Sequence, residues 1–247
     1  MALHTDLPPT QRQEPATDDA EQLRRQLADA IAMMERAQIM DFNGHFSTRL
    51  PGTPHILINS GKSVRSAVTP EDIITIDLDG RPIAGDAVPP MEFHIHASIY
   101  RRRPDVQAVA HTHPLWSTLL GMVGLPVLPV IMQAAVLGDI QVFPKTASIN
   151  SRALGEELAI ALGAHRVIAL KSHGAVVAGG NVVEAFVLAC YLEETAHRQY
   201  LARQIGEPTV LSAEDVRVIG QNLWKPHLLQ KVWDYHHAKL RRESAAS

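Results

Sequence analysis

The chain has 247 residues, of which 46% are hydrophobic and 20% are charged, and its net charge is -3 at pH 7. A chain of this length and apolar content can bury the core of an ordinary enzyme domain, which excludes a disordered protein. No segment is basic enough to bind a nucleic-acid backbone or an anionic membrane surface, so we expect neither as a partner.

Residues 1–17 are polar and proline-rich and show no apolar period, which predicts a mobile N-terminal arm. From residue 18 onward apolar residues recur on one helical face, at Leu23, Leu27, Ile31 and Met34. We find no internal repeat, low-complexity tract or linker after this point. We therefore expect residues 18–247 to form one domain that includes a C-terminal helical tail.

The remainder of the chain alternates between strand and helix patterns. Short runs rich in β-branched residues predict strands at 55–59, 72–77, 106–111, 127–132, 166–170 and 175–178. Helical periodicity predicts helices at about 91–102, 151–162, 182–203 and 213–237. This alternation indicates an α/β fold with a mixed sheet flanked by helices.

Cysteine content and hydropathy indicate the compartment. Cys190 is the single cysteine, so no intrachain disulfide can form, and the N-terminus does not resemble a signal peptide. The longest apolar stretch, residues 119–137, is interrupted by Pro126 and Pro129 and falls short of a membrane span. We expect a soluble, cytoplasmic protein in which Cys190 packs in the core.

Histidines suggest a metal site. The segment AVAHTHP, residues 108–114, reads as a strand that ends in His111 and His113, and residues two apart on a strand project to the same face. His173, in the loop that follows the strand at 166–170, is a candidate third ligand. Three neutral imidazoles suit Zn, Mn, Fe, Co or Ni and leave coordination positions open for a substrate. On spacing alone, a packing role for the pair is the alternative interpretation.

The predicted helix at 91–102 carries a second polar group. Glu92 and His96, four residues apart, share a helical face, so a carboxylate and an imidazole can project together. His94 points elsewhere, because residues two apart on a helix do not face each other.

Taken together, these segments resemble the class II aldolase/adducin family over residues 20–205. The motifs that carry the resemblance are GHFSTR (44–49), INSGK (58–62), TPEDIITIDLDG (69–80), MEFHIHASIYRRRPDVQAVAHTHP (91–114) and SHGAVVAGGNVVEAF (172–186). The resemblance implies one α/β/α domain with a central mixed, largely antiparallel sheet, and a homotetramer with sites at subunit interfaces. It also implies one divalent transition metal per subunit on His111, His113 and His173, with Glu92 as the catalytic residue.

The sequence departs from the family where sugar-phosphate enzymes hold phosphate. Those enzymes typically use a Gly-Asn turn, a Thr/Ser-Gly turn and a Ser-Ser pair. Here the Thr/Ser-Gly turn is retained as Ser60-Gly61, whereas the other two positions read Gly44-His45 and Pro90-Met91. The polar residues near these positions suit a carboxylate instead. The candidate substrate-binding residues are His45, Arg49, Ser60, Gly61, Lys62, Arg65 and His96. A solvated loop for Lys62 and Arg65, and a packing role for His96, are the alternatives.

This combination resembles the branch of the family that decarboxylates hydroxylated aromatic dicarboxylates, such as 3,4-dihydroxyphthalate or a hydroxypyridine dicarboxylate. The metal would chelate a substrate hydroxyl and carboxylate, and Glu92 would act as general acid/base. We expect its apolar neighbours to raise its pKa by desolvation. The alternatives are an aldolase acting on a non-phosphorylated hydroxy-aldehyde or hydroxy acid, and a non-catalytic adducin-like interaction module.

The C-terminal tail lies mostly outside these motifs. The resemblance implies that an aromatic residue of a neighbouring subunit can reach the active site, for which Tyr235 and His237 are the candidates. Packing of an aromatic-rich terminal helix is the other interpretation.

Overall fold

A seven-stranded sheet forms the centre of the part of the chain that the computed structural model describes, residues 17–244. The strands are β1 (His45–Arg49), β2 (Ile56–Asn59), β3 (Ile73–Ile76), β4 (Ala108–Thr112), β5 (Gln141–Phe143), β6 (Val167–Leu170) and β7 (Gly174–Gly179). Their order is β3-β2-β1-β4-β7-β6-β5, and every neighbouring pair is antiparallel except β5 and β6. The mixed, largely antiparallel sheet is therefore confirmed.

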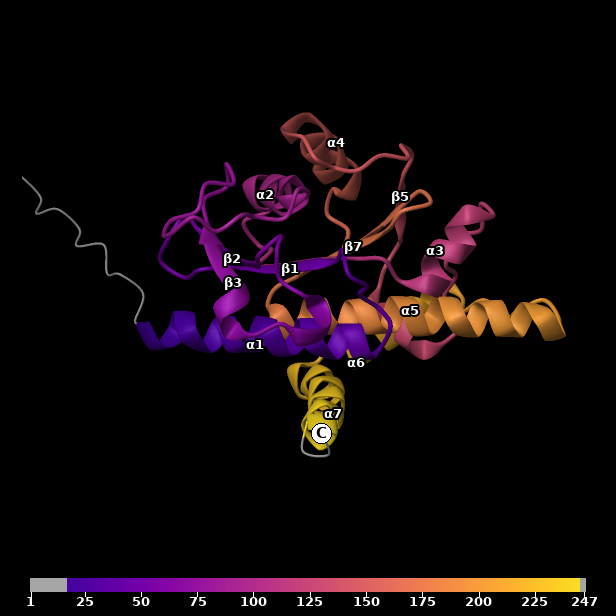
Figure 1. Cartoon of the computed structure of the whole chain (residues 1–247). Coiled ribbons are helices and arrows are strands. Elements are labelled where there is room, and N and C mark those ends of the chain that lie inside the picture. Colours follow the sequence, from indigo (N-terminus) through magenta and orange to yellow (C-terminus); the bar gives the residue numbers. More distant parts are fainter. Residues whose placement is uncertain (1–16, 245–247) are drawn as a thin grey trace, which may run out of the picture.

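Helices cover both faces of this sheet. They are α1 (Thr17–Arg36), α2 (Phe93–Arg102), α3 (Leu115–Met122), α4 (Arg152–Leu162), α5 (Val182–Ile205), α6 (Ala213–Leu223) and α7 (Pro226–Ser244). Figure 1 shows α2 and α4 on one face, and α1, α5 and α7 on the other. Each face has its own cluster of buried apolar residues. The architecture is the expected α/β/α arrangement.

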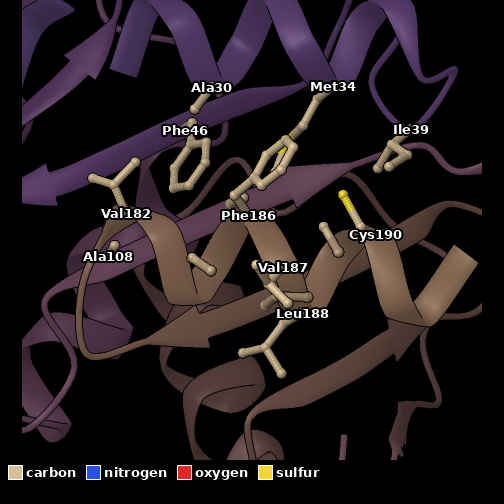
Figure 2. Packing of buried hydrophobic residues seen from close by; sticks show 14 of the residues in the cluster. Ala30, Met34, Ile39, Phe46, Ala108, Val182, Phe186, Val187, Leu188 and Cys190 are labelled. Carbon is tan, nitrogen blue, oxygen red and sulfur yellow. The ribbon is translucent and has the colours of Figure 1, made fainter. Parts of the chain in front are cut away.

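Strand alternation decides which side chains reach which helical layer. Phe46 of β1 and Ala108 of β4 pack toward Met34 of α1 and Phe186 of α5 (Figure 2). Because successive strand residues point to opposite faces, the alternate positions of the same strands face α2. His45 of β1 and His111 of β4 occupy such positions and belong to the candidate site.

The predicted helical face of α1 is confirmed, because Leu27, Ile31 and Met34 are fully buried. The predicted arm, residues 1–17, lies outside the described residues except for Thr17, with which α1 begins. Between Thr17 and Ser244, no helix is both long enough and apolar enough to cross a bilayer. Cys190 is buried, as expected, on α5.

Two predicted elements differ from the structure. The segment 127–132 is not a strand: its Leu128 amide donates to the Gln199 side chain on α5, and two prolines in and beside it have no N–H for a ladder. The predicted helix 213–237 is two helices, because Pro226 begins α7 and disfavours helical geometry in the residue before it.

Two strands and a helix were not predicted: β1, β5 and α3. Strand β1 buries polar side chains such as His45 and Ser47, so its sequence lacks the apolar alternation that identifies a strand. Strand β5 has only three residues.

Candidate metal centre

The end of β4 delivers the first two histidines. His111 lies in the strand, His113 follows it, and their Nε2 atoms are 3.1 Å apart. Strand alternation places both rings on the face of the sheet that α2 covers.

The two rings are held in a tautomer that suits a metal. The Nδ1–H of His111 donates to the Ala175 carbonyl at 3.0 Å, and the Nδ1–H of His113 donates to Asp41 Oδ2 at 3.1 Å. Each Nε2 therefore presents a lone pair, and two lone pairs at this separation repel. Two bonds of roughly 2.0–2.1 Å to one cation place their nitrogens about 2.9–3.4 Å apart. The pair fits a shared metal ion.

A tight turn between β6 and β7 brings in His173. Ser172 lies in the left-handed region at φ 54°, which costs a non-glycine residue roughly 1–2 kcal/mol. A Cβ on Gly174 would lie 2.2 Å from the Thr112 carbonyl and 3.0 Å from the His113 ring, so only glycine permits this approach. The His173 ring centroid lies 4.9 Å from that of His111.

Glu92 completes the cluster from the start of α2. Its Oε1 accepts from the Ser148 hydroxyl at 2.9 Å and the Ile149 amide at 2.6 Å. Its Oε2 lies 3.4 Å from His111 Nε2 and 3.7 Å from His173 Nε2. One ligand atom from each of Glu92 and the three histidines lies within 4.8 Å of all the others.

The expected rise in the pKa of Glu92 is wrong in its net effect. Burial does raise it, but the proximity of His111, the hydrogen bond from the Ile149 amide and the proximity of His173 outweigh burial and lower the pKa to about 2. Glu92 is therefore ionised at neutral pH. Sequence reasoning identified the apolar neighbours but not the donors that reach the carboxylate from distant segments.

A cavity of about 530 Å³ opens onto this cluster. Its apolar lining residues are Phe42, Pro90 and Met91. Phe42 is 80% exposed and Met91 is 73% exposed, so both are free to contact a bound molecule. The volume is in the range of small-molecule sites.

Three predicted substrate-binding residues line this cavity: His45, Gly61 and Arg65. Arg65 is buried rather than solvated, with Nε donating to Gly44 O at 2.5 Å and Nη1 to Ser63 Oγ at 2.7 Å. Among the described residues, its Nη2 has no hydrogen-bond partner. Arg65 can therefore use one arm to hold the loop and the other to bind an anion.

Two others lie outside the cavity lining. Lys62 is exposed, which agrees with the solvated-loop alternative. The Ser60 hydroxyl donates to Val88 O at 3.3 Å and accepts from the Lys62 amide at 3.2 Å, which stabilises the turn.

Arg49 corrects a prediction. It lies at the opposite end of β1 from His45, where its Nε donates to Val106 O at 2.9 Å and its Nη2 to Tyr100 O at 2.5 Å. The guanidinium also lies over the Tyr100 ring, 4.7 Å from the centroid. These contacts connect β1 to the end of α2, so Arg49 supports the fold rather than the cavity.

His96 is fully buried and contacts other protein groups instead of the cavity. One ring nitrogen lies 2.6 Å from His45 Nδ1, and the other lies 2.6 Å from Ser47 Oγ. It shares a side of α2 with Glu92, as expected, but His45 stands between their polar atoms.

The tail residues lie on α7, across the sheet from α2 (Figure 1). His237 Nε2 is 3.3 Å from Asp29 Oδ2 on α1, and the Tyr235 ring is 58% exposed. Within one chain neither lines the cavity. Their role at a neighbouring subunit's site stays a prediction.

Sequence reasoning missed Asp41, Ser148 and the Ile149 amide, which hold the ring of His113 and the carboxyl of Glu92. No local spacing marks these residues, because each lies more than 50 positions from the group that it holds.

The chain is similar to known proteins over most of its length. Residues 25–200 match the family described as Class II Aldolase and Adducin N-terminal domain. The chain is 28% identical to 3,4-dihydroxyphthalate decarboxylase of Terrabacter sp. (strain DBF63) over 210 residues, covering 79% of this chain and 88% of that protein. It is 29% identical to L-fuculose phosphate aldolase of Escherichia coli O6:H1 over 201 residues, covering 80% and 92%.

Solved structures show the same fold. L-fuculose 1-phosphate aldolase from Glaciozyma antarctica PI12 superposes with a TM-score of 0.82 at 20% identity, over 97% of this chain and 96% of that one.

Proposed function

Since this chain belongs to the class II aldolase and adducin family, we propose that it is a metal-dependent carbon–carbon lyase that decarboxylates a hydroxylated aromatic dicarboxylate. The substrate class has the chemistry of 3,4-dihydroxyphthalate or a hydroxypyridine dicarboxylate. The observation that carries the proposal is one cavity that combines an apolar wall, an arginine and the Glu/His cluster.

The cavity wall supports an aromatic acid over a sugar phosphate. Phe42, Pro90 and Met91 offer apolar surface to a planar ring. Pro90-Met91 stands where sugar-phosphate enzymes of the family carry a pair of hydroxyl donors. The Nη2 of Arg65 can pair with a carboxylate, and a guanidinium is the side chain best suited to that group.

His111, His113 and His173 would hold the metal, with Glu92 beside it. When bound, a divalent cation such as Zn, Mn, Fe or Co supplies Lewis acidity that stabilises negative charge on substrate oxygens. Three histidine ligands would leave coordination positions for a substrate, as catalytic sites do.

Glu92 performs the proton transfers. It is ionised at neutral pH, so its Oε2 accepts the proton of the ring hydroxyl beside the departing carboxylate. The bond from ring to carboxyl carbon breaks, carbon dioxide leaves, and the electron pair stays on the ring carbon. Glu92 then returns the proton to that carbon, a C–H bond replaces the C–C bond, and the ring oxygen, left as a phenolate, takes a proton from water. Ser148 and Ile149 hold Oε1 throughout, which keeps Oε2 directed at the substrate.

The test is metal analysis of the purified protein followed by an assay on ortho-hydroxy aromatic dicarboxylates. We expect about one divalent metal per chain and release of carbon dioxide from 3,4-dihydroxyphthalate with formation of 3,4-dihydroxybenzoate. Aldehyde release from a panel of hydroxy acids, without carbon dioxide from any dicarboxylate, would replace this proposal with the aldolase. Protein that binds no metal would favour the adducin-like module.

The aldolase is the second candidate, because the relatives include the fuculose phosphate enzyme at similar identity and coverage. Its chemistry would use the same cluster, since both reactions leave electron density on a carbon beside an oxygen. A non-phosphorylated substrate fits better, because two of the three phosphate-binding turns are absent.

The assembly forms part of the proposal. We propose a homotetramer in which Tyr235 or His237 of α7 closes a neighbouring subunit's cavity. Truncation after Gly220 would then reduce both assembly and turnover. Unchanged assembly and kinetics would leave α7 with a packing role only.

A further inference from the structure

A buried chain of hydrogen-bonding groups connects the cavity with the interior. His45 Nδ1 lies 2.6 Å from His96 Nε2, and His96 Nδ1 lies 2.6 Å from Ser47 Oγ. Ser47 Oγ lies 2.8 Å from the Tyr100 hydroxyl. His45 and Ser47 are two apart on β1, and His96 and Tyr100 are four apart on α2, so each pair shares the face that meets the other element.

The Tyr100 hydroxyl, at the interior end of this hydrogen-bonded series, sets the direction of every hydrogen bond in the series. Tyr100 is buried, and burial raises the pKa of its phenol, so the hydroxyl keeps its proton. Among the described residues, the one acceptor for that proton is Ser47 Oγ. Because Ser47 accepts from Tyr100, its own hydroxyl donates to His96 Nδ1. His96 then carries its proton on Nε2 and donates to His45 Nδ1. The reverse direction would leave the Tyr100 O–H buried without an acceptor, which is costly.

At the cavity end of the series, His45 therefore presents an N–H group. With Nδ1 of His45 acting as an acceptor, its ring proton is on Nε2. His45 is only 2% exposed, and Nε2 has no hydrogen-bond partner among the described residues. This atom lies 4.0 Å from Glu92 Oε2, and His45 lines the cavity. The geometry thus leaves one oriented donor without an acceptor beside the reacting groups.

The directions of these hydrogen bonds make both imidazoles neutral, because His45 and His96 each accept a hydrogen bond at Nδ1. Burial and the charge of His111 outweigh the opposing charge of Glu92 and lower the pKa of His96 to about 3. A neutral ring with a fixed tautomer donates a hydrogen bond without entering a protonation equilibrium.

We infer that His45 is a fixed, neutral N–H donor to a carboxylate oxygen of the substrate, and that His96, Ser47 and Tyr100 are positioning residues that hold it in this tautomer. The identity of the ligand rests on the proposed function. A carboxylate is the acceptor we assign, because it accepts without donating and the dianionic substrate needs donors beside the negative Glu92. With Arg65 on the same cavity, His45 would select for dicarboxylates.

The tautomer is measurable without turnover. We would record the ring-nitrogen NMR signals of full-length protein with ¹⁵N-labelled histidine, both metal-free and loaded with Zn²⁺, and assign His45 from the His45→Gln variant. We expect the proton on Nε2 in His45 and His96. Ser47→Ala should give His45 a mixture of tautomers, whereas Ser98→Ala, at a buried serine of α2 outside this network, should leave Nε2 protonated. A wild-type His45 with an unprotonated Nε2 would overturn the inference.

The ligand is tested by binding of phthalate, which has two carboxylates and no reactive hydroxyl, and of catechol, which has no carboxylate. His45→Leu should weaken phthalate binding by about 10- to 100-fold and leave catechol binding unchanged. His45→Gln, which keeps an N–H donor, should restore most of the phthalate affinity. Equal phthalate affinity in wild type and His45→Leu would overturn the assigned contact.

The two proposals fail in different ways. If wild-type protein binds no phthalate and releases no carbon dioxide, the proposed function falls together with the ligand assigned to His45. The NMR result would still decide whether His45 is a fixed donor. If carbon dioxide is released but the His45 proton is on Nδ1, the decarboxylase stands and the inference falls.

Discussion

The Nδ1–H of His113 donates to Asp41 Oδ2 at 3.1 Å, although 72 positions separate the two residues. This contact fixes the ring so that Nε2 faces His111 across the candidate metal position. A carboxylate that orients a ligand histidine in this way also makes its imidazole a stronger ligand.

Asp41→Asn should therefore weaken metal binding by about 10- to 100-fold. The amide oxygen can still accept from the Asn43 amide, as the carboxylate does now, so the loop and the thermal stability of the metal-free protein should change little. Competition against a chelator of known affinity measures the loss. Unchanged affinity would mean that Asp41 does not support the metal.

Gly174→Ala should lower stability by about 2 kcal/mol or more, because the added Cβ would collide with the Thr112 carbonyl and the strands β4 and β7 would have to separate. The metal should be lost with it, since His113 and His173 flank this contact. Gly121→Ala is the matched control, because a Cβ there has no neighbour within 4 Å and alanine favours helix α3. Urea unfolding and metal content distinguish the two variants.

Glu92→Gln should reduce turnover by about 10²- to 10⁴-fold, since an amide cannot accept and return the proton. The side-chain oxygen can still accept from Ser148 and Ile149, so the loop should keep its position. Metal content must be measured on the same sample. Full turnover with metal retained would remove the proton-transfer role, and Glu214→Gln, an exposed change on α6, controls for loss of charge.

Stability of the metal-free protein should fall as the pH drops below about 6.5. The unfolded chain binds protons at histidines whose folded pKa is lowered, so each such group stabilises the folded state above 6.5 and loses that contribution on acidification. For His96 the loss extends from 6.5 to its folded pKa of about 3. Each group contributes about 1.4 kcal/mol per pH unit within its window.

Unfolding by urea between pH 7 and pH 5 measures this slope. His96→Gln should flatten it, even if the variant is less stable at every pH, because glutamine does not titrate. An unchanged slope in this variant would show that His96 is not buried in its neutral form.

The sequence by itself determined the groups whose geometry follows from local rules. Two-residue alternation placed His111 and His113 on one face of a strand, and the position of His173 after a predicted strand marked it as a loop ligand. Helical periodicity located α2 and α5 to within about two residues. These patterns depend on near neighbours in the chain, so they can be read without knowing the fold.

Only the tertiary structure decided how these groups are held and charged. Arg49 and His45 belong to the same five-residue strand, yet Arg49 binds backbone carbonyls near Tyr100, whereas His45 faces the cavity. The pKa of Glu92 moved opposite to expectation because donors from distant segments converge on it. Hydrogen bonds and electrostatic interactions depend on separation in space, and the sheet and its helices bring together residues that no sequence spacing connects.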